Sequence, residues 1–143
     1  MQEVYGDIWD YLGKAVIVIT TSGSLTRDGR AVLGRGCARQ AAERFPNLAL
    51  QLGAMLQEQG NHVHNLGNGL VSFPVEESAW ALPDLRLIAR SARELKELAD
   101  REGWETIVVP RPGCGGGGLS WHEVRSLLMS QFDDRFLVIS SQS

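Results

Sequence analysis

AVIVIT at residues 15–20, and the segment TSGSLTRDGRAVLGRG that follows it at residues 21–36, decide the fold of this chain. An uninterrupted apolar run rich in β-branched residues is typical of a strand that is buried on both faces of a parallel sheet. TIVVP at residues 106–110 and FLVI at residues 136–139 have the same character. The sequence therefore predicts a sheet whose central strands are covered on both sides.

A hairpin and a series of helices are predicted between these runs. Two more strands are predicted at residues 62–66 and 70–73, around Gly67-Asn68-Gly69, where the Asn-Gly pair is a strong hairpin signal. Helical patterns cover residues 36–45, 48–59, 84–102 and 120–131. A proline or a glycine follows each of the first three and is expected to end it. Strands that alternate with helices predict an α/β fold: a three-layer α/β/α sandwich around a mixed, largely parallel sheet, in one domain spanning residues 1–143.

Composition and charge argue against several functional classes. The formal net charge is −3 and the basic residues are scattered, so we expect no non-specific binding to nucleic acid. No apolar run approaches the ~20 residues of a membrane span, and no leader segment is apparent. Neither Cys37 and Cys114 nor the three histidines have the spacing of a zinc site. We therefore expect a monomeric, cytoplasmic protein that uses no metal and no cofactor.

Glycine-rich segments follow two of the predicted central strands. The first ends in Gly34-Arg35-Gly36 at the start of a helix, and the second is RPGCGGGGLS at residues 111–120. Ser120, with Glu123 three residues later, has the spacing of a capping box for the next helix. Ligands of parallel sheets settle beyond the carboxyl ends of the strands, and amides at a helix N-terminus favour anions. The two loops therefore predict an anion site.

Two common phosphate-binding motifs do not fit these loops. A dinucleotide-binding fingerprint would need a third glycine where Arg39 stands, and the loop before it is too long for a tight turn. Gly113 and Gly118 have the separation of a Walker A loop, but Leu119 occupies the place of its lysine. What remains is a cradle of backbone amides suited to a diphosphate held without magnesium.

Several short motifs resemble those of macrodomains, and together they cover nearly the whole chain. They are Gly6-Asp7-Ile8, ITTSG at residues 19–23, LGRGCA at residues 33–38, Ser72-Phe73-Pro74, Asp84-Leu85, and residues 110–121. Their order and spacing are similar to those of compact bacterial and phage macrodomains. The branch they resemble includes ADP-ribosyl-glutamate hydrolases and antitoxins that strip ADP-ribose from DNA. The resemblance implies the macrodomain fold, ADP-ribose or an ADP-ribosylated molecule as ligand, and a setting in NAD metabolism or phage–host conflict.

The resemblance also implies roles for residues at matching positions. Asp7 would accept a hydrogen bond from the adenine amino group, and the Ile8 amide would contact the adenine ring. Ser22 stands near the expected distal ribose, where many relatives carry an asparagine. The other ligand contacts that the resemblance implies lie in the two loops: Thr21, Gly34, Gly36, Cys37, Gly113, Cys114, Gly115, Gly116, Gly117, Gly118 and Leu119.

The chain departs from the hydrolases of that branch at their catalytic positions. Those enzymes resemble one another in a lysine after a Phe/Leu-Pro-Thr motif and in an acid in the second loop. Here Phe73-Pro74 is followed by Val75 and Glu76, and Gly117 stands where the acid would be. A lysine-centred mechanism is therefore not expected.

Two functions remain open from the sequence. The first is a module that binds ADP-ribose without cleaving it. The alternative is an ADP-ribosyl hydrolase in which Glu76 or its neighbour Glu77 acts as a general base, with Asp28 and His122 as weaker candidates. Trp80, in the segment after Glu76, is expected either to shield the pocket or to pack in the core.

Overall fold

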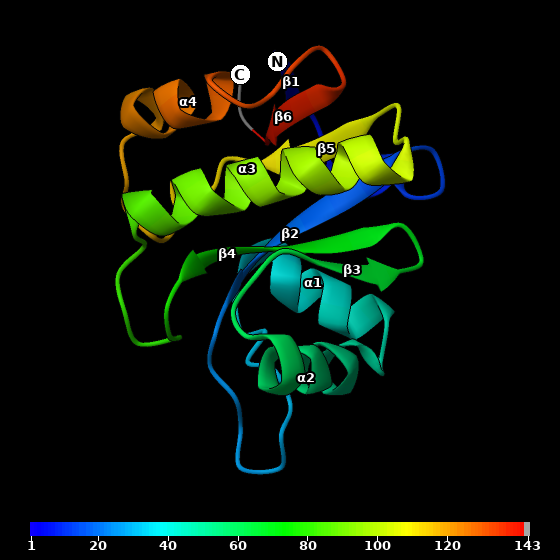
Figure 1. Ribbon diagram of the computed structural model, residues 1–143, viewed down its shortest axis with the longest axis vertical. Coiled ribbons are helices and arrows are strands. Elements are labelled where there is room, and N and C mark those ends of the chain that lie inside the picture. Colours follow the sequence, from blue (N-terminus) through cyan, green and yellow to red (C-terminus); the bar gives the residue numbers. More distant parts are fainter. Residues whose placement is uncertain (142–143) are drawn as a thin grey trace.

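The computed structural model describes residues 1–141 and is built around a six-stranded sheet (Figure 1). The strands are β1 Gln2–Tyr5, β2 Val16–Ser22, β3 His64–Gly67, β4 Leu70–Glu76, β5 Ile107–Pro110 and β6 Phe136–Ser140. Their spatial order is β1-β6-β5-β2-β4-β3. All neighbouring strands are parallel except β3 and β4, which form the predicted hairpin. The prediction of a mixed, largely parallel sheet is confirmed.

Helices cover both faces of this sheet, as the three-layer prediction required (Figure 1). The helices are α1 Gly36–Arg44, α2 Leu48–Gln59, α3 Leu85–Glu102 and α4 Trp121–Met129, with a short 3-10 helix, η1, at Ile8–Tyr11. Val18 of β2 belongs to the hydrophobic core under α3 and α4, whereas Ile17 and Ile19 belong to the core that contains the α1 and α2 side chains. The apolar run of β2 is therefore buried on both faces. No helix within residues 1–141 is long and apolar enough to cross a membrane.

The predicted helix ends are nearly all confirmed. Gly60 follows α2 with φ 86°, and Gly103 closes α3 in the left-handed conformation. Asp84 caps α3, because its side chain accepts a hydrogen bond from the Arg86 amide at 2.8 Å. The capping-box prediction for α4 is wrong: Ser120 is the N-cap residue, but its side chain makes no capping hydrogen bond.

Strand β4 continues past the predicted end at Phe73, through Pro74 to Glu76. Proline is usually confined to edges and bulges of a sheet because it lacks an N–H group. Pro74 meets that condition, since β3 pairs with β4 only as far as Ser72, and β2 has a register shift beside Pro74 between Thr21 and Ser22. The extension moves Glu76 from an expected loop into the sheet.

The parallel strands bring their carboxyl ends to one edge of the sheet. Asp7 follows β1, Pro110 ends β5, Ser22 ends β2 and Glu76 ends β4. Four strand spacings separate β1 from β4 in the sheet order, which corresponds to roughly 19 Å at the usual spacing between strands. Any ligand that contacts both ends of this edge must therefore be long.

Candidate functional site

A cavity of about 290 Å³ lies at the carboxyl ends of β2, β4 and β5, between the two glycine-rich loops. Its polar groups come from both loops and from the strand ends. Of the residues predicted for the site, it brings together Thr21, Ser22, Gly34, Gly36, Cys37, Glu76, Gly113, Gly115, Gly116 and Gly117. Residues of both glycine-rich loops therefore line one cavity, and the anion site itself stays a prediction.

A second cavity, of about 470 Å³, is lined by two more of the predicted contacts, Asp7 and Ile8. Pro110 lines both cavities, so the two meet at the end of β5. Asp7 is exposed at the start of η1, where its Oδ1 accepts a hydrogen bond from the Trp9 amide at 2.9 Å. That bond engages one of two carboxylate oxygens, and an ionised carboxylate accepts several hydrogen bonds.

The glycines of the second loop divide into two kinds. A Cβ atom on Gly113 would lie 2.8 Å from Leu119 Cδ1, and one on Gly117 would lie 2.6 Å from Pro83 Cγ. Gly113 also has φ 72°, and a Cβ atom on Gly117 would lie 2.7 Å from the Gly113 carbonyl oxygen, so this loop conformation favours glycine at both positions. A Cβ atom on Gly115 or Gly116 would meet nothing within 4 Å. The absence of side chains at these two positions keeps the cavity open.

Three predicted contacts do not line either cavity. Cys114 and Leu119 pack against the hydrophobic core under α3 and α4, and the Leu119 amide closes the loop by donating to the Gly113 carbonyl at 3.0 Å. Gly118 is exposed and adopts φ 79°. These residues contribute to the conformation of the second loop and do not line the cavity.

The first loop presents the N-terminus of α1 to the cavity. Gly36 is the first residue of α1 and has φ 56°, a conformation that favours glycine. Arg35 is the N-cap residue, and its side chain makes no capping hydrogen bond. Amides at a helix start that lack side-chain partners are suited to anions, because the helix dipole adds to their hydrogen bonds.

An ion pair between Arg35 and Glu76 joins the first loop to the end of β4. Arg35 Nη2 donates to both carboxylate oxygens of Glu76, at 3.1 and 3.3 Å. The Glu76 side chain is only 11% exposed, whereas that of Arg35 is 65% exposed. Both residues line the cavity, and Glu77, which is exposed, does not. The sequence analysis did not assign Arg35 to the site. The pattern that could have identified it is a basic residue in the loop after β2 and an acidic residue, Glu76, at the end of the neighbouring strand β4.

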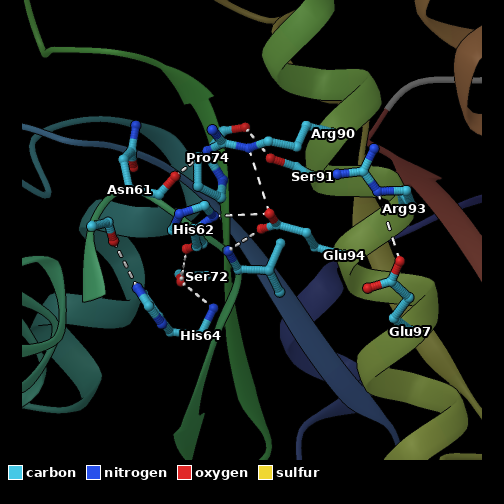
Figure 2. Close-up of polar contacts among 12 residues, drawn as sticks. Asn61, His62, His64, Ser72, Pro74, Arg90, Ser91, Arg93, Glu94 and Glu97 are labelled. Atoms are coloured by element: carbon cyan, nitrogen blue, oxygen red, sulfur yellow. Dashed lines mark hydrogen bonds and ion pairs between the residues drawn. The ribbon is translucent and has the colours of Figure 1, made fainter. Parts of the chain in front are cut away.

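A polar network joins residues 61–64 and strand β4 to α3 (Figure 2). Asn61 Nδ2 donates to the Glu76 carbonyl at 3.1 Å, and Arg90 Nη2 donates to the carbonyl of Asn61. Glu94 of α3 accepts from the Val63 amide at 3.0 Å and pairs with His62 Nδ1 at 2.8 Å. The network fixes the backbone at Glu76.

The histidines and cysteines do not form a metal site in the part of the chain that the structure describes. His64 contacts the Gly60 carbonyl through Nε2 at 2.9 Å. Burial raises the pKa of the Cys37 thiol, which lies in the cavity 3.9 Å from Thr20 Oγ1. Burial also raises the pKa of Cys114. Because the thiolate is the reactive form, neither cysteine is suited to act as a nucleophile.

The weaker catalytic candidates lie elsewhere. Asp28 is at the exposed tip of the first loop, where hydrogen bonds from Thr26 and Arg30 lower the pKa of its carboxyl group. His122 is exposed on α4. Both expectations for Trp80 are wrong: it is 91% exposed, so it neither packs in the core nor shields the cavity. The segment around it contributes Ala79 and Pro83 to the cavity wall instead.

Arg111 is a further residue of the site that the sequence did not identify. It lines the cavity at the end of β5, and its guanidinium stacks 4.8 Å from the centre of the Trp121 ring. Glu3 of β1 lies 4.0 Å from Arg111 and accepts a hydrogen bond from Trp121 Nε1 at 2.9 Å. The stacking keeps a cation beside the second loop.

Comparison with known proteins identifies the architecture. No protein-family model matches the chain, and no curated protein matches it. Among solved structures, the macrodomain of Mycobacterium tuberculosis DarG is similar with a TM-score of 0.79, at 23% identity over 99% of each chain.

Two further structures agree with that match. The macrodomain of Thermus aquaticus DarG has a TM-score of 0.73 at 19% identity, covering 99% of this chain and 97% of the other. Thermosipho africanus DarTG in complex with ADP-ribose has a TM-score of 0.72 at 20% identity, covering 97% of this chain and 42% of the other. The sheet order, the layers and these similarities together show that the chain has the macrodomain fold.

Proposed function

We propose that this protein binds ADP-ribose, free or attached to another molecule, along the edge formed by the two cavities. The observation that carries the proposal is the row of strand ends from Asp7 to Glu76, along which two cavities share Pro110. An edge roughly 19 Å long matches an extended ligand with a base at one end and a sugar at the other.

The middle of this edge is suited to a diphosphate. The N-terminus of α1 and the open cradle at Gly115 and Gly116 line the same cavity. Backbone amides in such a place hold phosphates without a metal ion. Arg111 adds a positive charge at the same level of the sheet. The similarity to Thermosipho africanus DarTG in complex with ADP-ribose supports the same ligand here.

The geometry favours binding over hydrolysis. Glu76, the first candidate for a general base, has both carboxylate oxygens hydrogen-bonded to Arg35. Glu77 is exposed and lies outside the cavity lining. The positions where the hydrolases of the resembled branch carry their lysine and their acid hold Glu76 and Gly117 in this chain. We therefore propose a binding protein.

The setting of the protein is part of the same proposal. We place it as a single-domain monomer in the cytoplasm, where Cys37 and Cys114 remain as free thiols. The excess of 17 acidic over 14 basic residues disfavours a nucleic-acid backbone as the partner.

Isothermal titration calorimetry with ADP-ribose, AMP and NAD tests the proposal. We expect a dissociation constant for ADP-ribose in the micromolar range, and weaker binding of AMP, which reaches only the Asp7 end of the edge. NAD carries a nicotinamide on the distal ribose and serves as a second control. Absence of binding by all three would reject the proposal.

A further inference from the structure

The Arg35–Glu76 ion pair lies at the end of the site that is farthest from Asp7. Glu76 ends β4 and Asp7 follows β1, with β6, β5 and β2 between them. The backbone carbonyl of Glu76 accepts a hydrogen bond from Asn61 at 3.1 Å, and the Glu76 carboxylate accepts hydrogen bonds from Arg35. Glu76 is thus held at its backbone and at its side chain, which gives its carboxylate a defined position on the cavity wall.

The chemistry of a fixed carboxylate limits what it can bind. When ionised, it only accepts hydrogen bonds, so its partner in the ligand must present donors. A phosphate in contact with Glu76 would be repelled, because both groups are negatively charged. The hydroxyl groups of a neutral sugar are such donors, because two neighbouring hydroxyl groups can each donate a hydrogen bond to one of the two carboxylate oxygens.

Arg35 balances the negative charge that Glu76 places in the cavity. The diphosphate that we propose would lie in the same cavity, and an unpaired carboxylate beside it would weaken its binding. The guanidinium of Arg35 offsets the charge of Glu76 within hydrogen-bond distance. It also holds the carboxylate through two hydrogen bonds, from a residue whose backbone forms the N-cap of α1.

We infer that Glu76 binds the hydroxyl groups of the terminal sugar and that Arg35 is the residue that positions it. The inference rests on the proposed function and makes it more specific. The ligands selected are nucleoside diphosphates that end in a neutral, hydroxyl-bearing sugar. Those that end in a phosphate are rejected. Glu76 thus determines specificity at the sugar end, as Asp7 does at the base end.

Calorimetry with ADP-ribose and with ADP tests the role of Glu76, because ADP lacks the terminal sugar. We expect Glu76→Gln to reduce the preference for ADP-ribose over ADP by about tenfold or more, the usual effect of losing hydrogen bonds to a charged group. The affinity for ADP itself should stay the same or rise. Glu77→Gln is the matched control, since it makes the same charge change outside the cavity and should leave the preference unchanged.

The role of Arg35 has its own test. Arg35→Gln leaves the Glu76 charge unbalanced and should weaken both ADP-ribose and ADP. Adding Glu76→Gln to that variant should restore the affinity for ADP. Arg39→Gln removes an arginine that pairs with Glu43 on the exposed side of α1, and should change neither affinity.

Other outcomes would overturn the inference without touching the proposed function. If the preference for ADP-ribose over ADP is the same in the wild type and in Glu76→Gln, Glu76 is not a sugar ligand. If Arg35→Gln weakens both ligands and the double variant restores neither, Arg35 contacts the diphosphate directly. A wild-type measurement with a 2-deoxyribose analogue of the terminal sugar needs no variant to fold; undiminished affinity would also reject the role of Glu76. Failure of ADP-ribose and ADP alike to bind the wild type would instead reject the proposed function.

Discussion

Ser91 donates a hydrogen bond of 2.7 Å to the carbonyl oxygen of Pro74, in the fully buried space between α3 and β4. Pro74 lies beyond the last pairing of β4 with β3, so this carbonyl has no strand partner on that side. A buried carbonyl without a partner is costly, and the Ser91 hydroxyl supplies one. The contact supports β4 immediately before Glu76.

Replacement of Ser91 by alanine should therefore lower the free energy of unfolding by about 1–3 kcal/mol, the cost of leaving a buried acceptor unsatisfied. Urea denaturation followed by circular dichroism measures the effect. Ser126→Ala is the control, because its hydroxyl bonds the His122 carbonyl on the exposed surface of α4. Equal stability of the two variants would show that the Pro74 carbonyl finds another partner.

At Gly116, glutamate should abolish ADP-ribose binding and leave the fold intact. The backbone there does not need glycine, since no positive φ is present and a Cβ atom would meet nothing within 4 Å. The new side chain would fill the cavity and place a negative charge beside the diphosphate. Calorimetry together with a thermal melt checks both points. Ser120→Glu is the control, because it adds the same charge to the same loop outside the cavity. Normal ADP-ribose binding by Gly116→Glu would show that Gly115 and Gly116 do not form the ligand cradle.

For Asp7, asparagine is the informative replacement because it preserves the cap of η1. The amide oxygen can still accept from the Trp9 amide, but the NH₂ group would face the amino group of adenine. We expect ADP-ribose binding to weaken by about 1–3 kcal/mol, with an unchanged melting temperature. Asp10→Asn, in the first turn of the same helix, is the control. Unaltered affinity would mean that adenine is held elsewhere.

Acid should weaken the structure through Asp133. Hydrogen bonds from the Arg135 guanidinium at 2.8 and 2.9 Å lower the pKa of Asp133 from 3.8 to about 2. Because the folded value lies below the unfolded one, the pair contributes stability above pH 4 and loses it as the pH falls toward 2.

The Asp133→Asn variant should accordingly be less stable than the wild type at neutral pH, by at most about 1 kcal/mol since the pair is exposed. This difference should shrink between pH 4 and pH 2, which urea midpoints at pH 7, 4 and 2 would show. Glu58→Gln is the control, because this side chain is exposed on α2 and makes no ion pair within residues 1–141. A difference that stays constant with pH would contradict the assignment.

The sequence predicted those parts of the fold that long apolar patterns encode. The runs of β2, β5 and β6 and the periodic stripe of α3 lie where they were expected. Strand β1 was not predicted, since Gln2–Tyr5 is short and half polar, and its place in the sheet depends on pairing with β6, at the other end of the chain. Local patterns carry no record of such long-range pairing.

The site was predicted where glycine marks it and missed where side chains meet across the fold. Gly34, Gly36 and Gly116 line the cavity as expected. Glu76 was expected in a loop because Pro74 resembled a strand end, whereas β4 continues through it. Arg35 escaped notice because its partner lies 41 positions away, and only the adjacency of β2 and β4 brings them together.

The edges of the sheet have a consequence for how the protein behaves at high concentration. Strands β1 and β3 form the two edges, and each has only four residues. Glu3 adds a charge to the first, and the second ends in the Gly67 turn. Short edges of this kind give a foreign strand few backbone groups to pair with, which protects against aggregation. The long apolar strand β2 cannot pair with a foreign strand, because it lies between β5 and β4 inside the sheet.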